Sequence, residues 1–189
     1  MIERNGTTAE DRPARREFLC LGALWVSGLA ALPTSTAAAS VERTLSFYNL
    51  QTGESLSTPY WIEGEYLTEP LAAINRLLRD HRTDEVLPIE LGLLDLLHGL
   101  RERVTAYRQQ PLHIVSAYRS PTSNAKLRAH NPRVAANSLH QYGKAVDIRL
   151  PGCRLADLHR AALSMGAGGV GYYPASDFIH IDVGRVRRW

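Results

Sequence analysis

The sequence is poor in cysteine and in net charge, and each shortage excludes a class of protein. Its 189 residues include two cysteines, Cys20 and Cys153. That number excludes a disulfide-rich scaffold and a cysteine-based zinc finger, so any metal must bind histidine or carboxylate side chains. The formal net charge of +3 is too small to indicate a nucleic-acid partner without a clustered basic patch. The chain is 44% hydrophobic and 22% charged, without repeats or low-complexity segments, as is typical of a globular domain.

Long apolar runs are also lacking, and the main one has the features of an export signal. Residues 18–32 form an apolar run of about 15 residues, whereas a membrane-spanning helix needs ~20. The run follows Arg15-Arg16 and ends at Pro33, before small residues that offer an A-x-A cleavage site. We therefore expect a twin-arginine export signal at 1–39, a mature domain over 40–189 without a membrane span, and a periplasmic location. An uncleaved anchor helix is the alternative.

Hydrophobic periodicity in residues 40–189 predicts a single α+β domain with a small, mostly antiparallel sheet and flanking helices. Strands are predicted at residues 43–50, 112–118, 145–150, 169–173 and 178–183. Helices are predicted from residue 68, over 90–108, over 121–127 and from 155 to the glycine at 166. Thr68 is expected to cap the first helix. In this arrangement helices come first, and the sheet dominates the second half.

Chemically capable side chains concentrate in three stretches, which are residues 116–120, 138–147 and 177–182. Gly143 lies between His140 and Asp147 and can adopt a positive φ, so the chain can turn both side chains toward one point. His180 lies on a predicted strand, with Asp182 on the same face. Two imidazoles and one carboxylate match a catalytic zinc site, which keeps a fourth position for water. The spacing alone leaves open that His180 is a hydrogen-bonded core residue.

The pattern Ser-x-His-x-x-Gly-x-Ala-x-Asp at residues 138–147, followed by a histidine on a strand, resembles a superfamily of zinc peptidases. That superfamily includes D-Ala-D-Ala carboxypeptidases, D-Ala-D-Ala dipeptidases and the hedgehog domain. Within it, the chain resembles the MepK-type murein endopeptidases from about Leu45 to Trp189. The likeness includes residues 49–55, 161–165 and 167–174. It implies a hedgehog/D-Ala-D-Ala-peptidase-like fold and one Zn²⁺ ion bound by His140, Asp147 and His180.

The resemblance also implies catalytic roles for three other residues. Arg119 stands in a Ser-x-Tyr-Arg-Ser stretch that faces the active site in the superfamily, where a guanidinium would hold a substrate carboxylate or polarise the carbonyl. The alternative is a surface arginine before a turn. The superfamily places a glutamate base three residues before the third ligand, and here that position is Asp177, one methylene shorter. Asp182 is the rival, as a base or as an orienter of a ligand, and the sequence leaves both open.

Together these features predict an exported zinc metallopeptidase that hydrolyses amide bonds in peptidoglycan cross-links. Bonds that join two diaminopimelate residues are one candidate implied by the resemblance. The first alternative is a D,D- or L,D-carboxypeptidase that trims stem peptides. The second is a non-catalytic, zinc-containing module that binds the cell wall.

Overall fold

The computed structural model describes residues 41–189, except residue 133. The predicted export signal at 1–39 lies outside these residues. Within the described range, no helix is long and apolar enough to cross a membrane.

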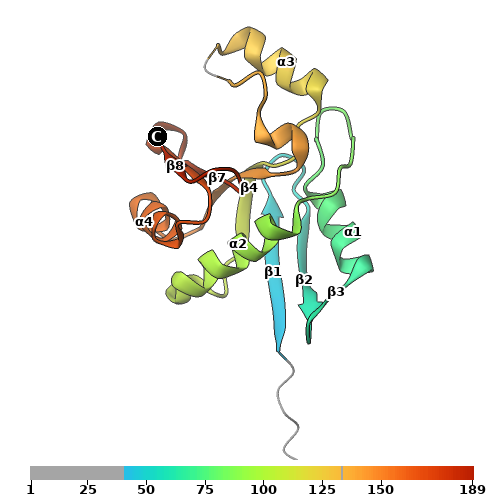
Figure 1. Ribbon diagram of the computed structural model, residues 1–189, viewed down its shortest axis with the longest axis vertical. Coiled ribbons are helices and arrows are strands. Elements are labelled where there is room, and N and C mark those ends of the chain that lie inside the picture. Colours follow the sequence, from blue (N-terminus) through green and yellow to red (C-terminus); the bar gives the residue numbers. More distant parts are fainter. Residues whose placement is uncertain (1–40, 133) are drawn as a thin grey trace, which may run out of the picture. The chain divides into compact units, whose positions relative to one another are not determined.

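Eight strands of the described chain form one mixed sheet (Figure 1). They are β1 Glu42–Asn49, β2 Ser55–Ile62, β3 Glu65–Tyr66, β4 Leu112–Ser116, β5 Ala145–Arg149, β6 Gly169–Tyr173, β7 Phe178–Asp182 and β8 Arg187–Arg188. Their order across the sheet is β3-β2-β1-β4-β5-β7-β6-β8. The β1–β4 and β6–β8 pairs are parallel, and the other five pairs are antiparallel. The strands that were predicted to carry the site, β4, β5 and β7, therefore lie side by side.

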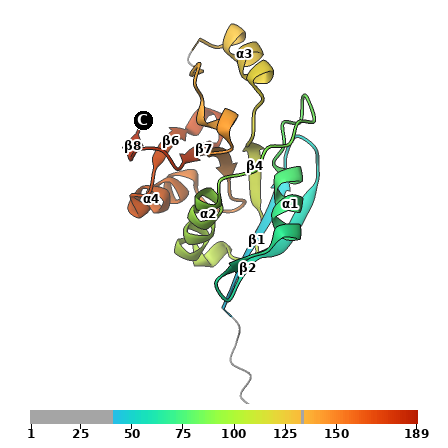
Figure 2. The ribbon, with the colours of Figure 1, turned by 45° about the vertical axis from the view of Figure 1, so that its right-hand side comes forward.

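Helices pack on one face of this sheet. The α-helices are α1 Thr68–Leu77, α2 Leu91–Arg103, α3 Pro121–His130 and α4 Leu155–Met165. Short 3-10 turns lie at Thr105–Tyr107, Leu139–Tyr142 and Pro174–Ser176. Both ribbon views show α2 between α1 and α4, with α3 set apart at one end (Figures 1 and 2).

The core lies between these helices and the sheet. Ile114, Ile148 and Ile179 are buried on neighbouring strands, and Leu97 of α2 is fully buried in the same cluster. Side chains alternate along a strand, so the residue next to each of these isoleucines points to the opposite face of the sheet. Asp147 lies beside Ile148, so it belongs to that second face.

The predicted α+β class, the single domain and the mostly antiparallel sheet are confirmed, but the predicted extent of the sheet is wrong. Strands β2, β3 and β8 were not expected, so the strand predicted at residues 43–50 is the first half of a β1–β2 hairpin. Pro59 argues against a strand at β2. It lies opposite Thr44, where the register between the strands shifts, a position that tolerates a missing N–H. Two residues are too few for β3 or β8 to show any periodicity.

Three helix boundaries also differ from the prediction, and one of them is the end of α3, which lies at His130 instead of residue 127. The N-cap of α1 is Leu67, which makes no side-chain cap, so Thr68 is the first helical residue instead of the cap. Helix α2 ends at Arg103, and a separate 3-10 turn follows at Thr105–Tyr107. The apolar spacing that was extended to residue 108 therefore spans two elements.

A buried carboxylate connects the end of α1 to the start of α3. Asp80 is 1% exposed and accepts hydrogen bonds from the backbone N–H groups of Ser120 at 2.8 Å and Arg82 at 3.0 Å. Burial alone would raise the pKa of Asp80, but the nearby hydroxyls of Ser123 and Ser120 and the backbone N–H groups lower it to about 2. Ser120 is the N-cap of α3 and directly follows Arg119, so Asp80 fixes the backbone beside that arginine.

We predict that Asp80→Asn lowers the free energy of unfolding at pH 7 by about 1–3 kcal/mol, because a buried hydrogen-bonded charge is lost. The pKa is lowered from an ordinary value of 3.8, so this contribution is present above about pH 4 and disappears as the pH falls toward 2. Urea unfolding at pH 7 and at pH 2.5 measures both values. Asp84→Asn is the control, because this exposed acid contributes little through its ion pairs. Equal losses for the two variants at pH 7 would contradict the prediction.

Candidate metal centre

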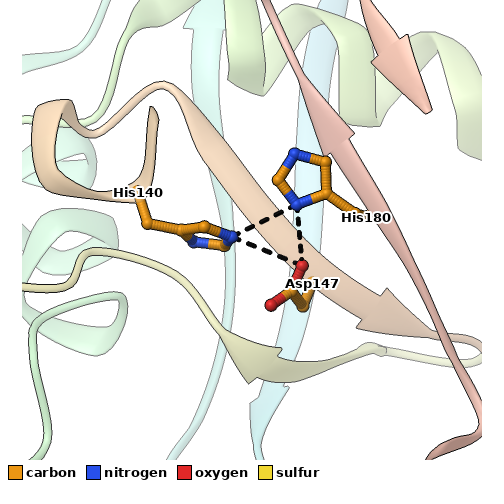
Figure 3. Close-up of side chains that lie close together, drawn as sticks. All are labelled: His140, Asp147 and His180. Carbon is orange, nitrogen blue, oxygen red and sulfur yellow. Dashed lines mark hydrogen bonds and ion pairs between the residues drawn. The ribbon is translucent and has the colours of Figure 1, made fainter. Parts of the chain in front are cut away.

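Three buried side chains from separate parts of the chain meet on the second face of the sheet (Figure 3). His140 lies on the Leu139–Tyr142 turn, Asp147 lies in β5 and His180 lies in β7. His180 Nδ1 is 2.9 Å from Asp147 Oδ1 and 3.2 Å from His140 Nε2. His140 Nε2 is 3.4 Å from the same Asp147 oxygen. The structure thus brings together the three residues that the sequence predicts as metal ligands.

Strand pairing places two of the three. Asp147 and His180 are direct partners in the antiparallel β5–β7 pair, so their side chains project from the same face. His140 reaches them through a tight turn that ends at Gly143, which has a φ of 65°. A Cβ atom there would lie 2.5 Å from the carbonyl oxygen of Pro88. Only glycine fits this turn without displacing the backbone that precedes α2.

A bulge in β4 lies next to the His140 turn, and the residues that follow the bulge form hydrogen bonds with the turn. The register between β4 and β5 shifts between Ile114 and Ser116. Beyond this shift, the carbonyl of Ala117 accepts a hydrogen bond from His140 Nδ1 at 2.7 Å. The N–H of Arg119 donates to the carbonyl of His140 at 3.1 Å. Bulges commonly re-aim a strand beside an active site, and this one fixes both the ring and the backbone of His140.

The hydrogen bonds on the outer nitrogens fix which ring atoms are free to bind a metal. The Ala117 carbonyl can only accept, so Nδ1 of His140 carries the hydrogen and Nε2 of the neutral ring has a free lone pair. His180 Nε2 lies 2.9 Å from the Asp182 carboxylate and its Nδ1 lies 2.9 Å from Asp147 Oδ1, so each ring nitrogen can donate to a carboxylate. A cation that replaced the proton on Nδ1 would meet a nitrogen lone pair from each histidine and an oxygen of Asp147. This donor set fits a divalent cation.

The pKa directions in the cluster show how a proton on His180 and the charge on Asp147 stabilise each other. Burial alone would raise the pKa of Asp147, but the imidazoles of His140 and His180 hold it well below its usual range. Burial alone would lower the pKa of His180, but hydrogen bonds with Asp147 and Asp182 raise it above its usual value. Both shifts favour positive charge at the point where the three side chains meet.

Arg119 lies at the edge of the cluster and is itself 7% exposed. Its Nη2 is 3.9 Å from Asp147 Oδ2 and 3.3 Å from Ser116 Oγ, and its Nη1 is 3.3 Å from Asn124 Oδ1. Its buried Nε has no hydrogen-bond partner in residues 41–189 as described. The guanidinium is thus a buried cation whose hydrogen bonds are long and incomplete. It is not the surface arginine of the alternative hypothesis.

The two candidate acids occupy very different surroundings. Asp182 is fully buried and accepts hydrogen bonds from the backbone N–H groups of Gly169 at 3.1 Å and Gly184 at 2.8 Å, besides its contact with His180. Asp177 ends the Pro174–Ser176 turn at a φ of 52°, and its side chain is 66% exposed. Its ion-pair contact is with Arg149, at 3.4 Å. Arg149 lies two residues after Asp147 in β5, on the same face of the sheet.

Comparison with known proteins agrees with this geometry. A family model described as peptidoglycan L,D-endopeptidase MepK matches residues 37–189. The chain is 40% identical over 178 residues to the peptidoglycan L,D-endopeptidases MepK of Escherichia coli K12 and Shigella flexneri, covering 93% of this chain and 96% of each relative. It is 35% identical over 178 residues to a probable peptidoglycan L,D-endopeptidase MepK of Haemophilus influenzae, covering 93% of this chain and 95% of that protein.

This chain belongs to the MepK family. The motif at residues 138–147 and the later His180 thus predicted the side chains that converge in the structure, and the likeness from about Leu45 to Trp189 predicted the family. The carbonyl of Ala117 and the side chain of Asn124 were not predicted as parts of the site. A carbonyl is present at every residue and leaves no signal in a sequence. Asn124 lies on α3, five residues after Arg119, and only the fold shows that it faces the guanidinium.

We predict that Gly143→Ala destabilises this MepK-family protein more than Gly53→Ala does. Both glycines have positive φ, at 65° and 75°, so an added Cβ costs ~1–2 kcal/mol of backbone strain at either position. Around Gly53 no atom lies within 4 Å of the added Cβ, whereas at Gly143 it meets the Pro88 carbonyl. The extra cost should be about 1–3 kcal/mol by urea unfolding. Metal binding should weaken only in Gly143→Ala, because that turn carries His140. Equal destabilisation and unchanged metal binding would contradict this account.

Proposed function

We propose that this protein is an exported, zinc-dependent peptidoglycan L,D-endopeptidase. The observation that carries the proposal is the convergence of two imidazole lone pairs and a carboxylate in a chain of the MepK family. The relatives in that family are named for cleavage of peptidoglycan, and their similarity extends over nearly the whole chain.

His140 Nε2, His180 Nδ1 and an oxygen of Asp147 would hold one zinc ion. Three protein ligands are the usual set of a catalytic zinc site, which leaves room for water or substrate. Zinc bound there would supply a Lewis acid and lower the pKa of a water molecule toward neutrality. The protein contributes ligands whose orientation is fixed in advance by Ala117 and Asp182.

Arg119 would bind the substrate beside these ligands. A buried guanidinium that lacks good partners gains most from an incoming carbonyl or carboxylate oxygen, because the low local dielectric strengthens the hydrogen bond. Arg119 is 3.9 Å from Asp147 Oδ2, so an oxygen bound to it lies close to the metal ligands. We assign it the stabilisation of negative charge on the amide oxygen during hydrolysis.

Asp177 is the better candidate for the general base, and Asp182 orients His180. Both oxygens of Asp182 are engaged, and it contacts the nitrogen of His180 that points away from the other two ligands. Asp177 keeps an exposed carboxylate, and an exposed ion pair such as Asp177–Arg149 holds it only weakly. It can therefore take a proton from water and pass it to the leaving amine.

We also propose that the protein is exported and that it shares its fold with other zinc peptidases. The twin-arginine pattern at Arg15-Arg16 and the position of peptidoglycan outside the cytoplasm support a periplasmic location. The domain over 40–189 would share its fold with the D-Ala-D-Ala peptidases and the hedgehog domain, as the residue pattern at 138–147 implies.

Two other functions predict different products. A D,D- or L,D-carboxypeptidase would remove terminal residues from stem peptides. A zinc-containing wall-binding module would release nothing. The family membership favours an endopeptidase over both.

We predict that the purified protein cleaves cross-linked muropeptides internally and that a chelator stops the reaction. Mass spectrometry of the digest distinguishes new internal cuts from the loss of terminal residues. His140→Ala should bind less than one tenth of the zinc bound by the wild type and should release no product, because one of three ligands is lost. His130→Ala, at the exposed end of α3, is the matched histidine control and should behave as the wild type does. Terminal trimming, or zinc binding without any product, would overturn the proposal.

We predict that Asp177→Asn retains zinc but lowers the hydrolysis rate by about 10²–10⁴-fold, the usual contribution of a general base. Asp182→Asn should weaken zinc binding about 10–100-fold, because it orients a ligand. Zinc content and muropeptide turnover are measured on the same preparations. Asp157→Asn, a helix-surface acid paired with arginines, is the control. Full turnover in Asp177→Asn would remove Asp177 from the mechanism.

A further inference from the structure

Residues 184–189 form a second layer of contacts behind His180. Arg187 binds the Asp182 carboxylate with two nitrogens, Nη2 to Oδ2 at 2.6 Å and Nη1 to Oδ1 at 3.0 Å. Asp182 in turn contacts His180 Nε2. A two-pronged arginine–carboxylate pair restricts rotation of the carboxylate as well as binding it. Arg187 therefore sets the angle at which Asp182 meets the imidazole.

Trp189 contacts the same imidazole from another side. Its ring centroid lies 5.2 Å from that of His180, at an interplanar angle of 48°. The Arg187 guanidinium carbon lies 4.8 Å from the centroid of the Trp189 ring, within the range of a cation–π contact. The indole N–H donates to the hydroxyl oxygen of Tyr173 at 2.7 Å. Backbone hydrogen bonds to Val170 at 3.2 Å and from Tyr172 at 3.0 Å attach Trp189 to β6.

Two glycines of β6 leave the space that this layer fills. Gly171 is the direct strand partner of His180, and a Cβ on it would lie 2.8 Å from the indole of Trp189. A Cβ on Gly169 would lie 2.4 Å from Asp182 Oδ2 and 2.5 Å from Arg187 Nη1. Glycine inside a strand weakens it, so its presence at both positions indicates a close approach by another group. The glycine-rich run at residues 166–171 thus makes room for the contacts behind the metal ligand.

We propose that Arg187 and Trp189 are positioning residues of the metal centre. Arg187 orients Asp182, and Trp189 blocks rotation of the His180 ring, so Nδ1 of His180 stays directed at His140 and Asp147. This inference rests on the proposed metal-dependent function. Loss of such outer contacts at metal sites typically lowers metal affinity about 10–100-fold.

The chain contains a matched control for both residues. On β1, Arg43 binds Asp95 of α2 at 2.7 Å, and its guanidinium carbon lies 4.3 Å from the ring centroid of Trp61. This second Asp-Arg-Trp cluster has the same chemistry and sits at β1 and β2, where none of the three ligands lies. Arg43→Lys and Trp61→Phe therefore measure how much stability is lost when such a cluster is changed away from the metal centre.

The decisive measurement compares zinc affinity, by chelator competition, in Arg187→Lys, Trp189→Phe and the two control variants. We expect about 10–100-fold weaker zinc binding in Arg187→Lys and Trp189→Phe, and wild-type affinity in Arg43→Lys and Trp61→Phe. The visible spectrum of the Co²⁺-loaded protein should change only in the first pair, because it reports ligand geometry. A purely structural role would shift the unfolding midpoint of all four variants and leave zinc affinity and the Co²⁺ spectrum unchanged.

A second measurement, tryptophan fluorescence, tests the position of Trp189 in variants that still bind Co²⁺. Bound Co²⁺ should quench tryptophan emission strongly in the wild type and in Trp61→Phe, but weakly in Trp189→Phe, because the Trp189 ring touches a ligand. Wild-type zinc affinity and spectrum in Arg187→Lys and Trp189→Phe would overturn this inference and leave the proposed function intact. Failure of the wild-type protein to bind zinc or Co²⁺ would overturn the proposed function, and the inference with it.

Discussion

The site depends on a single electrostatic constraint, which is that two imidazole nitrogens and a carboxylate oxygen face one buried point. The Ala117 carbonyl and the Asp182 carboxylate each bind the other nitrogen of a histidine ring and so orient the two rings. A buried carboxylate such as Asp147 needs a compensating positive charge, because it has given up hydrogen bonds to water. A proton on His180 or a bound cation would supply that charge. The bulge in β4 and the turn at Gly143 are arranged so that this set can form.

The sheet supplies the rigidity that the constraint needs. Asp147 and His180 are cross-strand partners in the interior of the sheet, and the residues beside them, Ile148 and Ile179, are buried against the helices. A side chain on such a strand cannot move without disturbing the core beneath it. His140 comes from a short turn, and the turn is bound at both its backbone and its ring. The one support that is not a β-strand is therefore fixed by hydrogen bonds of its own.

The sequence predicts those features that repeat or match a motif. Alternation of apolar residues is sufficient for β1, β5 and β7, and the spacing at 138–147 with a later histidine is sufficient for the three side chains that converge. Sequence patterns fail for β2, where Pro59 opposes strand formation and pairing with β1 and β3 stabilises the strand. They also cannot separate Asp177 from Asp182. Strand alternation places Asp182 on the face of His180, but the surroundings of each carboxylate depend on ion pairs that alternation does not show, with Arg187 for Asp182 and with Arg149 for Asp177.

The surroundings of these two acids support the different roles that we propose for them. Burial alone would raise the pKa of Asp182, but hydrogen bonds with His180, Arg187 and the backbone of Gly184 hold it far below its usual range. Protonating such a carboxylate would break several buried interactions at once, which makes it a poor carrier of a proton and a good anchor. Asp177 has none of these partners, and solvent reaches most of its side chain. An acid that must gain and lose a proton in each turnover functions best in exposed surroundings such as those of Asp177, where the change of charge disrupts no buried network.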